Sequence, residues 1–166
     1  MLMESDFYKM KKKLLKTQIK KFGIIFTLFC LALTVCMLSQ LDFLTSKGIP
    51  YTDSSVFQYM GRIIDAGYIP YKDSFDHKGL LLYFINFIGV KIAYHRGIWL
   101  IELIFMITTV IGIYKMSRLF CGRFQSIMVV MLVLSPMTIY FQGGNLTEEY
   151  ALPMQIWSLY ICRLYS

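Results

Sequence analysis

The residues of this chain that suit chemistry gather in one polar stretch, residues 50–79, and in a shorter acidic stretch further along. A carboxylate beside an apolar surface holds its proton more tightly than in water, which suits it to act as a general base towards a hydroxyl group. A lysine at the start of an apolar segment is suitably placed to bind a phosphate at the level of lipid headgroups. The residues that fit these roles are Asp53, Asp73, Asp76, Lys78, Glu148 and Glu149.

The composition places these residues in a membrane protein. Of 166 residues, 57% are hydrophobic and 16% are aromatic, and the mean hydropathy of +0.55 lies above the range of ordinary soluble domains. A net charge of +7 would favour nucleic acid as a partner if the basic residues formed one exposed face. Instead they flank apolar segments, before residue 22 and again between residues 115 and 123. This is the positive-inside pattern, and it argues against nucleic-acid binding.

The apolar segments predict an all-α, polytopic protein of the cell membrane with about four crossings. Residues 1–21 are expected to form a basic cytoplasmic N-terminus, and residues 22–166 a single transmembrane domain. Within that domain, loops on the outer face are expected at 42–96 and 142–150. The crossings are expected at 22–41, 97–116, 125–141 and 151–166, of which the last is marginal in length.

Two short helices are predicted within the first outer loop, at 53–66 and 80–93. The first is amphipathic, because Asp53 and Ser54 suit a helix N-cap and apolar residues then recur at helical spacing until Gly67. The second has about 14 apolar residues, short of the roughly 20 that a crossing needs. Counting it as a crossing would also put the later basic turn outside. Both helices are therefore predicted on the outer side, the first at the membrane surface and the second either at the surface or re-entrant.

Two local motifs, in this order of elements, give the chain a specific resemblance. The motifs are D-S-S-x-F at residues 53–57 and G-Y-I-P-Y-x-D-x-F-D-H-K-G-L-L-L-Y at residues 67–83. Over most of its length, the chain resembles the GT-C superfamily of glycosyltransferases. The nearest branch is the protein O-mannosyltransferase-like enzymes, which use polyprenyl-phosphate sugars. In that fold, two juxtamembrane helices follow the first crossing.

The resemblance implies transfer of a sugar, with inversion, from a polyprenyl-phosphate donor to an acceptor hydroxyl at the cell surface. Asp53 matches the family's catalytic base, and Lys78 matches the lysine that contacts the lipid phosphate. Glu148 or Glu149 stands where the family has an acid in its second outer loop, and the choice between them stays open. Gly79 stands where the family often has proline, and the family has many more crossings. The chain is therefore expected to be an N-terminal portion or a truncated form, whose site a partner subunit would complete.

Simpler roles are open for several of these residues. Asp53 also suits a plain N-cap, and Lys78 also suits a lysine that only extends its ammonium group to the interface. Glu102 is an acid inside a predicted crossing, where acids are usually paired or functional, and pairing with Arg96 is the simplest account.

Two further alternatives concern ligands and the chain as a whole. The carboxylates of both outer loops suit a divalent cation, although oxygen ligands alone are a weak signal, and no cofactor is otherwise indicated. The alternative to a transferase is a small, non-enzymatic multi-pass membrane protein, either an accessory subunit or a fragment of a transporter.

Overall fold

The computed structural model describes residues 2–38, 53–141 and 143–165, and for residues 2–10 only the backbone. These residues form helices joined by short turns and one longer loop, with a single isolated bridge between Pro70 and Ser74 and no strand. The all-α fold is therefore confirmed for the described part of the chain. The helices are α1 (Leu2–Met37), α2 (Asp53–Asp65), α3 (Leu80–Ala93), α4 (His95–Ser117), α5 (Arg123–Leu134), α6 (Met137–Tyr140) and α7 (Thr147–Tyr165).

Three stretches of the described residues are long and apolar enough to cross a membrane, namely Lys11–Met37, His95–Ser117 and Arg123–Tyr140. The chain is a membrane protein, as its composition predicts. α3 has 14 residues and falls short of a crossing. α7 has 19 residues but is less apolar and is not among the three stretches, so a fourth crossing there stays a prediction.

Two predicted boundaries differ from the helices in the structure. The sequence divides this region into a basic segment, 1–21, and a crossing, 22–41, whereas α1 is one helix of 36 residues that contains most of both. Lysine is a good helix former, so the basic residues need not end the helix. The predicted crossing 125–141 is divided into α5 and α6 at Ser135 and Pro136, because proline has no N–H to donate to the helix.

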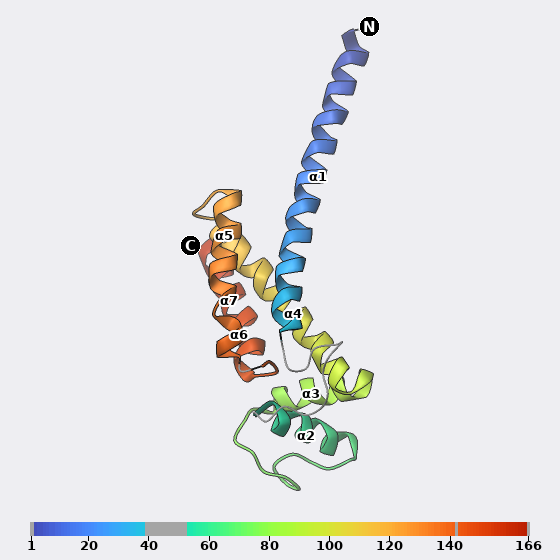
Figure 1. Ribbon diagram of the computed structural model, residues 1–166, viewed down its shortest axis with the longest axis vertical. Coiled ribbons are helices and arrows are strands. Elements are labelled where there is room, and N and C mark those ends of the chain that lie inside the picture. The colour runs from blue at the N-terminus through green and yellow to red at the C-terminus, as the bar shows by residue number, and fades with distance from the viewer. Residues whose placement is uncertain (1, 39–52, 142, 166) are drawn as a thin grey trace.

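α4 lies at the centre of the molecule, and α1, α5 and α7 pack against it (Figure 1). Ala32 and Cys36 of α1 are buried in the same cluster as Val110 of α4. The Trp99 indole N–H, at the start of α4, donates a hydrogen bond of 2.8 Å to the Cys36 carbonyl. This contact joins the end of α1 to the end of the molecule where the short helices lie.

α2 and α3 lie across that end of the longer helices, while the N-terminal half of α1 stands free at the other (Figure 1). The two helices approach closely at Gly61, where an added Cβ would lie 2.8 Å from the backbone carbonyl carbon of Asn86. Phe57 of α2, Tyr83 of α3 and Tyr150 of α7 share a second buried cluster. The start of α7 is thereby packed against α2 and α3, which places the polar residues of all three segments near one another.

Candidate functional site

A cleft of about 330 Å³ lies where α2, the loop before α3, α6 and the start of α7 meet. Three residues that the sequence singles out line this cleft: Asp53, Lys78 and Glu148. They come from three segments that are far apart in the chain. The lining thus contains two acidic residues and one lysine, and its other residues are Phe57, Tyr140, Phe141, Leu146 and Thr147.

Asp53 is the first residue of α2, and its side chain is exposed. The positive end of the helix dipole favours a carboxylate in this first turn. Ser54, the next residue, is fully buried and faces the interior of the molecule. Because neighbouring helical residues point in different directions, Ser54 can face the interior while Asp53 lines the cleft.

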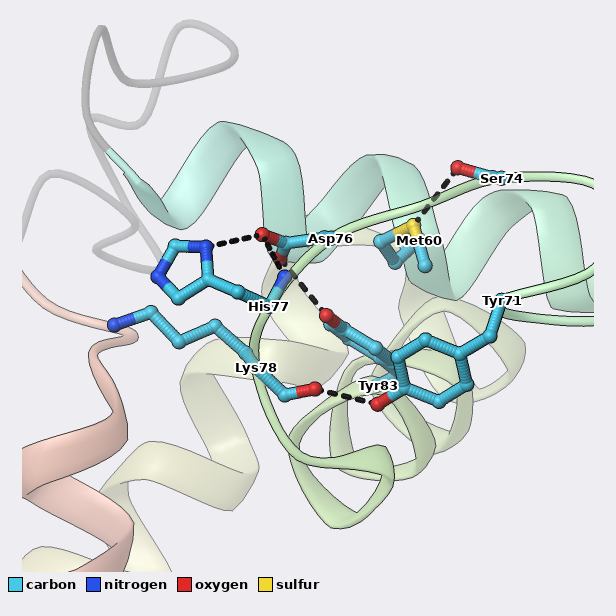
Figure 2. Close-up of polar contacts among 7 residues, drawn as sticks. All are labelled: Met60, Tyr71, Ser74, Asp76, His77, Lys78 and Tyr83. Atoms are coloured by element: carbon cyan, nitrogen blue, oxygen red, sulfur yellow. Dashed lines mark hydrogen bonds and ion pairs between the residues drawn. The ribbon is translucent and has the colours of Figure 1, made fainter.

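Lys78 is half-buried, and its ammonium nitrogen lies 6.0 Å from the centre of the Phe57 ring. Its carbonyl accepts a hydrogen bond from the Tyr71 hydroxyl. Figure 2 shows the carbonyl and the ammonium group of Lys78 pointing in opposite directions, the first towards Tyr71 and the second away from it. The backbone of Lys78 is therefore fixed on one side while its charge extends into the cleft.

Asp76 secures the other side of the same loop (Figure 2). Its carboxylate accepts hydrogen bonds from the His77 backbone N–H at 2.7 Å and from the Tyr83 hydroxyl at 2.8 Å. The His77 imidazole lies 3.0 Å from the same carboxylate. Tyr83 is fully buried in α3, so the loop is anchored to a fixed point. We name Tyr71, Asp76 and Tyr83 the lysine clamp.

Neither Asp73 nor Asp76 is among the residues that line the cleft. The Asp73 carboxylate accepts a hydrogen bond of 2.8 Å from the Ile69 backbone N–H, and the two residues close a turn within the loop. Both acids, which the sequence offers as candidates for binding substrate or metal, make hydrogen bonds within the loop or to α3 in the structure.

The structure separates the two neighbouring glutamates. Glu148 is exposed and lines the cleft, whereas Glu149 is buried and faces the interior. Glu149 accepts a hydrogen bond of 3.2 Å from the Leu146 backbone N–H and forms a side-chain hydrogen bond with Glu102. Burial raises the pKa of Glu149 to about 7, although these hydrogen bonds oppose the rise. Glu148 is therefore the glutamate that can meet a ligand in the cleft.

Behind the cleft lies a buried polar cluster that the sequence does not reveal. Its centre is Asn145, whose side-chain amide donates to the Ser54 hydroxyl and to the Asn86 side-chain oxygen, both at 2.9 Å. The Asn145 side-chain oxygen accepts from the Tyr150 hydroxyl at 2.7 Å, and its backbone N–H donates to Glu102 at 3.1 Å. The only sign of this cluster in the sequence is the presence of polar residues, such as Glu102 and Asn145, inside or beside apolar segments.

Within the described part of the chain, no group of three or more histidines, cysteines, aspartates or glutamates lies close enough to hold a metal ion. The cleft itself offers the carboxylates of Asp53 and Glu148, and the divalent cation stays a prediction.

Among the described residues, the Thr147 hydroxyl is buried beside the cleft without a hydrogen-bond partner. Chemically, the site can bind a phosphate through Lys78 and accept a proton from a hydroxyl group through a carboxylate.

Comparison with known proteins finds no match, whether among protein-family models, curated proteins or solved structures.

Proposed function

We propose that this chain forms the lipid-phosphate and acceptor side of a GT-C-type glycosyltransferase site, which transfers a sugar from polyprenyl phosphate to an acceptor hydroxyl. The observation that carries the proposal is the cleft that Asp53, Lys78 and Glu148 share. The resemblance assigns Asp53 to the base and Lys78 to the phosphate contact, and Glu148 is one of the two glutamates that stand where the family has its second acid. They come from three segments, and packing for stability alone does not require them to face one space.

In the proposed reaction, the acceptor oxygen attacks the anomeric carbon of the donor sugar. The bond between that carbon and the phosphate oxygen breaks, so the configuration at the anomeric carbon inverts. The proton of the hydroxyl passes to Asp53, a general-base step that typically contributes about 10²- to 10⁴-fold to the rate. The departing phosphate gains negative charge, which the Lys78 ammonium group stabilises.

The proposed orientation puts the cleft on the outer face of the cell membrane. α2 and α3 then lie at the outer surface, and the N-terminus and the basic turn between α4 and α5 are cytoplasmic. The fourth crossing begins in α7 at residue 151, after the outer loop 142–150. The support is the distribution of basic residues and the short length of α3.

The roles of Asp53 and Lys78 compete with simpler ones. A first-turn aspartate stabilises a helix without any catalytic role, and a lysine near a membrane often only extends to the interface. The lysine clamp favours the functional role for Lys78, because a lysine that merely extends to water needs no fixed backbone. The shared cleft favours the functional role for Asp53.

Binding of the lipid phosphate can be tested without knowing the sugar. The chain is expressed in membranes and exposed to undecaprenyl phosphate that carries a photoreactive group in its prenyl chain. We expect labelling of the protein that free undecaprenyl phosphate competes away, and at least about tenfold weaker labelling of Lys78→Gln, as for the loss of a charged hydrogen bond. Lys72→Gln, in the same loop but exposed and outside the cleft, is the matched control. Equal labelling of both variants contradicts the phosphate role.

Transfer is measured with a panel of undecaprenyl-phosphate hexoses and pentoses, labelled in the sugar, as loss of label from the lipid. Asp53→Asn is expected to reduce transfer at least about 10²-fold while leaving photolabelling intact. Asp73→Asn is the matched control, because Asp73 is an acid outside the cleft. Full transfer by Asp53→Asn rules out the assigned base. Labelling of the wild type with no transfer from any donor favours the accessory role.

A further inference from the structure

Asn145 connects four helices from one buried position. Its side chain contacts Ser54 of α2, Asn86 of α3 and Tyr150 of α7, and its backbone N–H contacts Glu102 of α4. Both hydrogens of its amide group and its side-chain oxygen are used in these contacts. A buried amide with every group satisfied fixes the relative positions of its partners, since shifting any one of them leaves a buried polar group unpaired.

The contact between Asn145 and Ser54 joins two residues that lie beside the cleft in the chain. Ser54 follows Asp53 directly, and Asn145 itself lies three residues before Glu148. The hydrogen bond between Asn145 and Ser54 therefore joins the segment that carries one cleft carboxylate to the segment that carries the other. The Gln58 side-chain amide, one turn later in the same helix, donates a hydrogen bond of 3.4 Å to the Ser54 hydroxyl, so this hydroxyl accepts from α2 as well as from Asn145.

The backbone of Asn145 is adapted to this position. Its φ is +58°, in the left-handed region that asparagine tolerates better than most residues. Its side chain is fully buried, so the Asn-Leu-Thr sequence that begins at Asn145 is not accessible as a glycosylation site. The strain and the burial both indicate that an asparagine is needed here for its contacts.

We propose that Asn145 is the positioning residue of the cleft, which sets the separation of Asp53 and Glu148 through its hydrogen bond to Ser54. This inference rests on the proposed function, because it assigns a purpose to that separation. Lys78 is held by the lysine clamp, whose members make no described hydrogen bond to Asn145. Loss of the Asn145 side chain should therefore impair transfer and spare binding of the lipid phosphate.

The experiment uses the full chain in lipid nanodiscs and the variants Asn145→Gly and Ser54→Ala. Glycine adopts positive φ without strain, so Asn145→Gly removes the side chain and keeps the turn. Ser54→Ala removes the acceptor alone and is the milder change. We expect each variant to lower kcat for transfer at least about tenfold, as misplacement of a reacting group does, with KM and photolabelling by undecaprenyl phosphate changed less than about twofold. The double variant should be no slower than the slower single variant, because both changes remove the same hydrogen bond between Asn145 and Ser54.

Hydrogen exchange of backbone amides gives a readout that does not depend on transfer. Asn145→Gly should speed exchange at residues 54–58 and 146–150 at least about tenfold and leave residues 69–78 and 104–116 unchanged. Unchanged exchange at 54–58, or a fall in photolabelling as large as the fall in kcat, overturns the proposal for Asn145. If the wild type transfers no sugar, the proposed function fails, and the exchange rates alone decide whether Asn145 holds the two segments together.

Discussion

The Tyr83 hydroxyl donates a hydrogen bond of 2.8 Å to the Asp76 carboxylate, and this bond ties the loop before Lys78 to the buried face of α3. Burial and the hydrogen bond to Asp76 both raise the pKa of Tyr83, so its hydroxyl stays protonated and remains a donor. Because Tyr83 is packed in the second buried cluster, the position of Lys78 depends on the packing of α3.

Removing this hydroxyl should weaken phosphate binding without touching the cleft. Tyr83→Phe removes one hydrogen bond to a charged group, worth about 1.5–3 kcal/mol when buried and less at this half-buried carboxylate. We expect about three- to tenfold weaker competition by undecaprenyl phosphate in the photolabelling assay. Tyr68→Phe, at an exposed tyrosine, is the matched control. If undecaprenyl phosphate competes equally well with the photoreactive lipid in both variants, the lysine clamp does not position Lys78.

The buried Glu149 should make the stability of the protein depend on pH. Its pKa is raised to about 7 from an ordinary value near 4.5, so the folded protein binds this proton more tightly than the unfolded chain does. The stabilising contribution is complete below the ordinary value and is lost as the pH rises through the raised pKa of the folded state.

Thermal unfolding in detergent micelles at about pH 5 and about pH 7.5 measures this effect. The wild type should unfold at a lower temperature at the higher pH, and Glu149→Gln should reduce the difference, because glutamine does not titrate. Glu148→Gln, one residue away and exposed, should keep the difference. A pH dependence that survives Glu149→Gln assigns the titration to another group.

Adding a methyl group at Gly61 should disturb the packing of α2 on α3. The new Cβ would lie 2.8 Å from a backbone carbon of Asn86, which cannot move as a flexible side chain would. We expect Gly61→Ala to destabilise the protein by about 1–3 kcal/mol, measured as a lower unfolding temperature. Gly23→Ala, where nothing lies within 4 Å of the added atom, should not destabilise it. A tolerated Gly61→Ala would mean that the two helices lie further apart.

The prediction that both ends of α3 lie on the outer side of the membrane can be tested with cysteines placed near each end. Lys72 precedes α3, Arg96 follows it, and both side chains are exposed. If α3 does not cross the membrane, Lys72→Cys and Arg96→Cys should both react with an impermeant maleimide added to intact cells. Cys121, in the turn between α4 and α5, should react only after permeabilisation. Reaction of Lys72→Cys alone from outside would make α3 a crossing and reverse every later segment.

The short helices were well predicted because their signals are local. The expected helix at 80–93 coincides with α3, and the one at 53–66 differs from α2 by a single residue. Capping residues, helical spacing and the lengths of apolar runs are all visible within about one helix length of sequence. The start of the crossing at residue 22 stays a prediction, because hydropathy marks where a helix enters a membrane, whereas charged residues that form helix well let α1 begin much earlier.

The buried cluster was not predictable from local patterns. Asn145 meets Ser54 across 91 positions of sequence and Asn86 across 59, and these contacts exist only once α2, α3 and α7 have packed. The same packing distinguishes Glu148 from Glu149, which the sequence treats alike. Neighbouring residues at a helix start point in different directions, and the side that is buried depends on which helices lie behind.

The unbroken course of α1 has a mechanical consequence. At 1.5 Å per residue its 36 residues extend about 54 Å, whereas the hydrocarbon core of a bilayer is about 30 Å thick. When its apolar turns occupy the bilayer, the turns that carry Lys11, Lys12 and Lys13 extend well beyond the headgroups. Charges are screened over about 8 Å at physiological ionic strength. The continuous helix thus holds positive charge beyond the lipid headgroups, where an acidic molecule in solution can contact it.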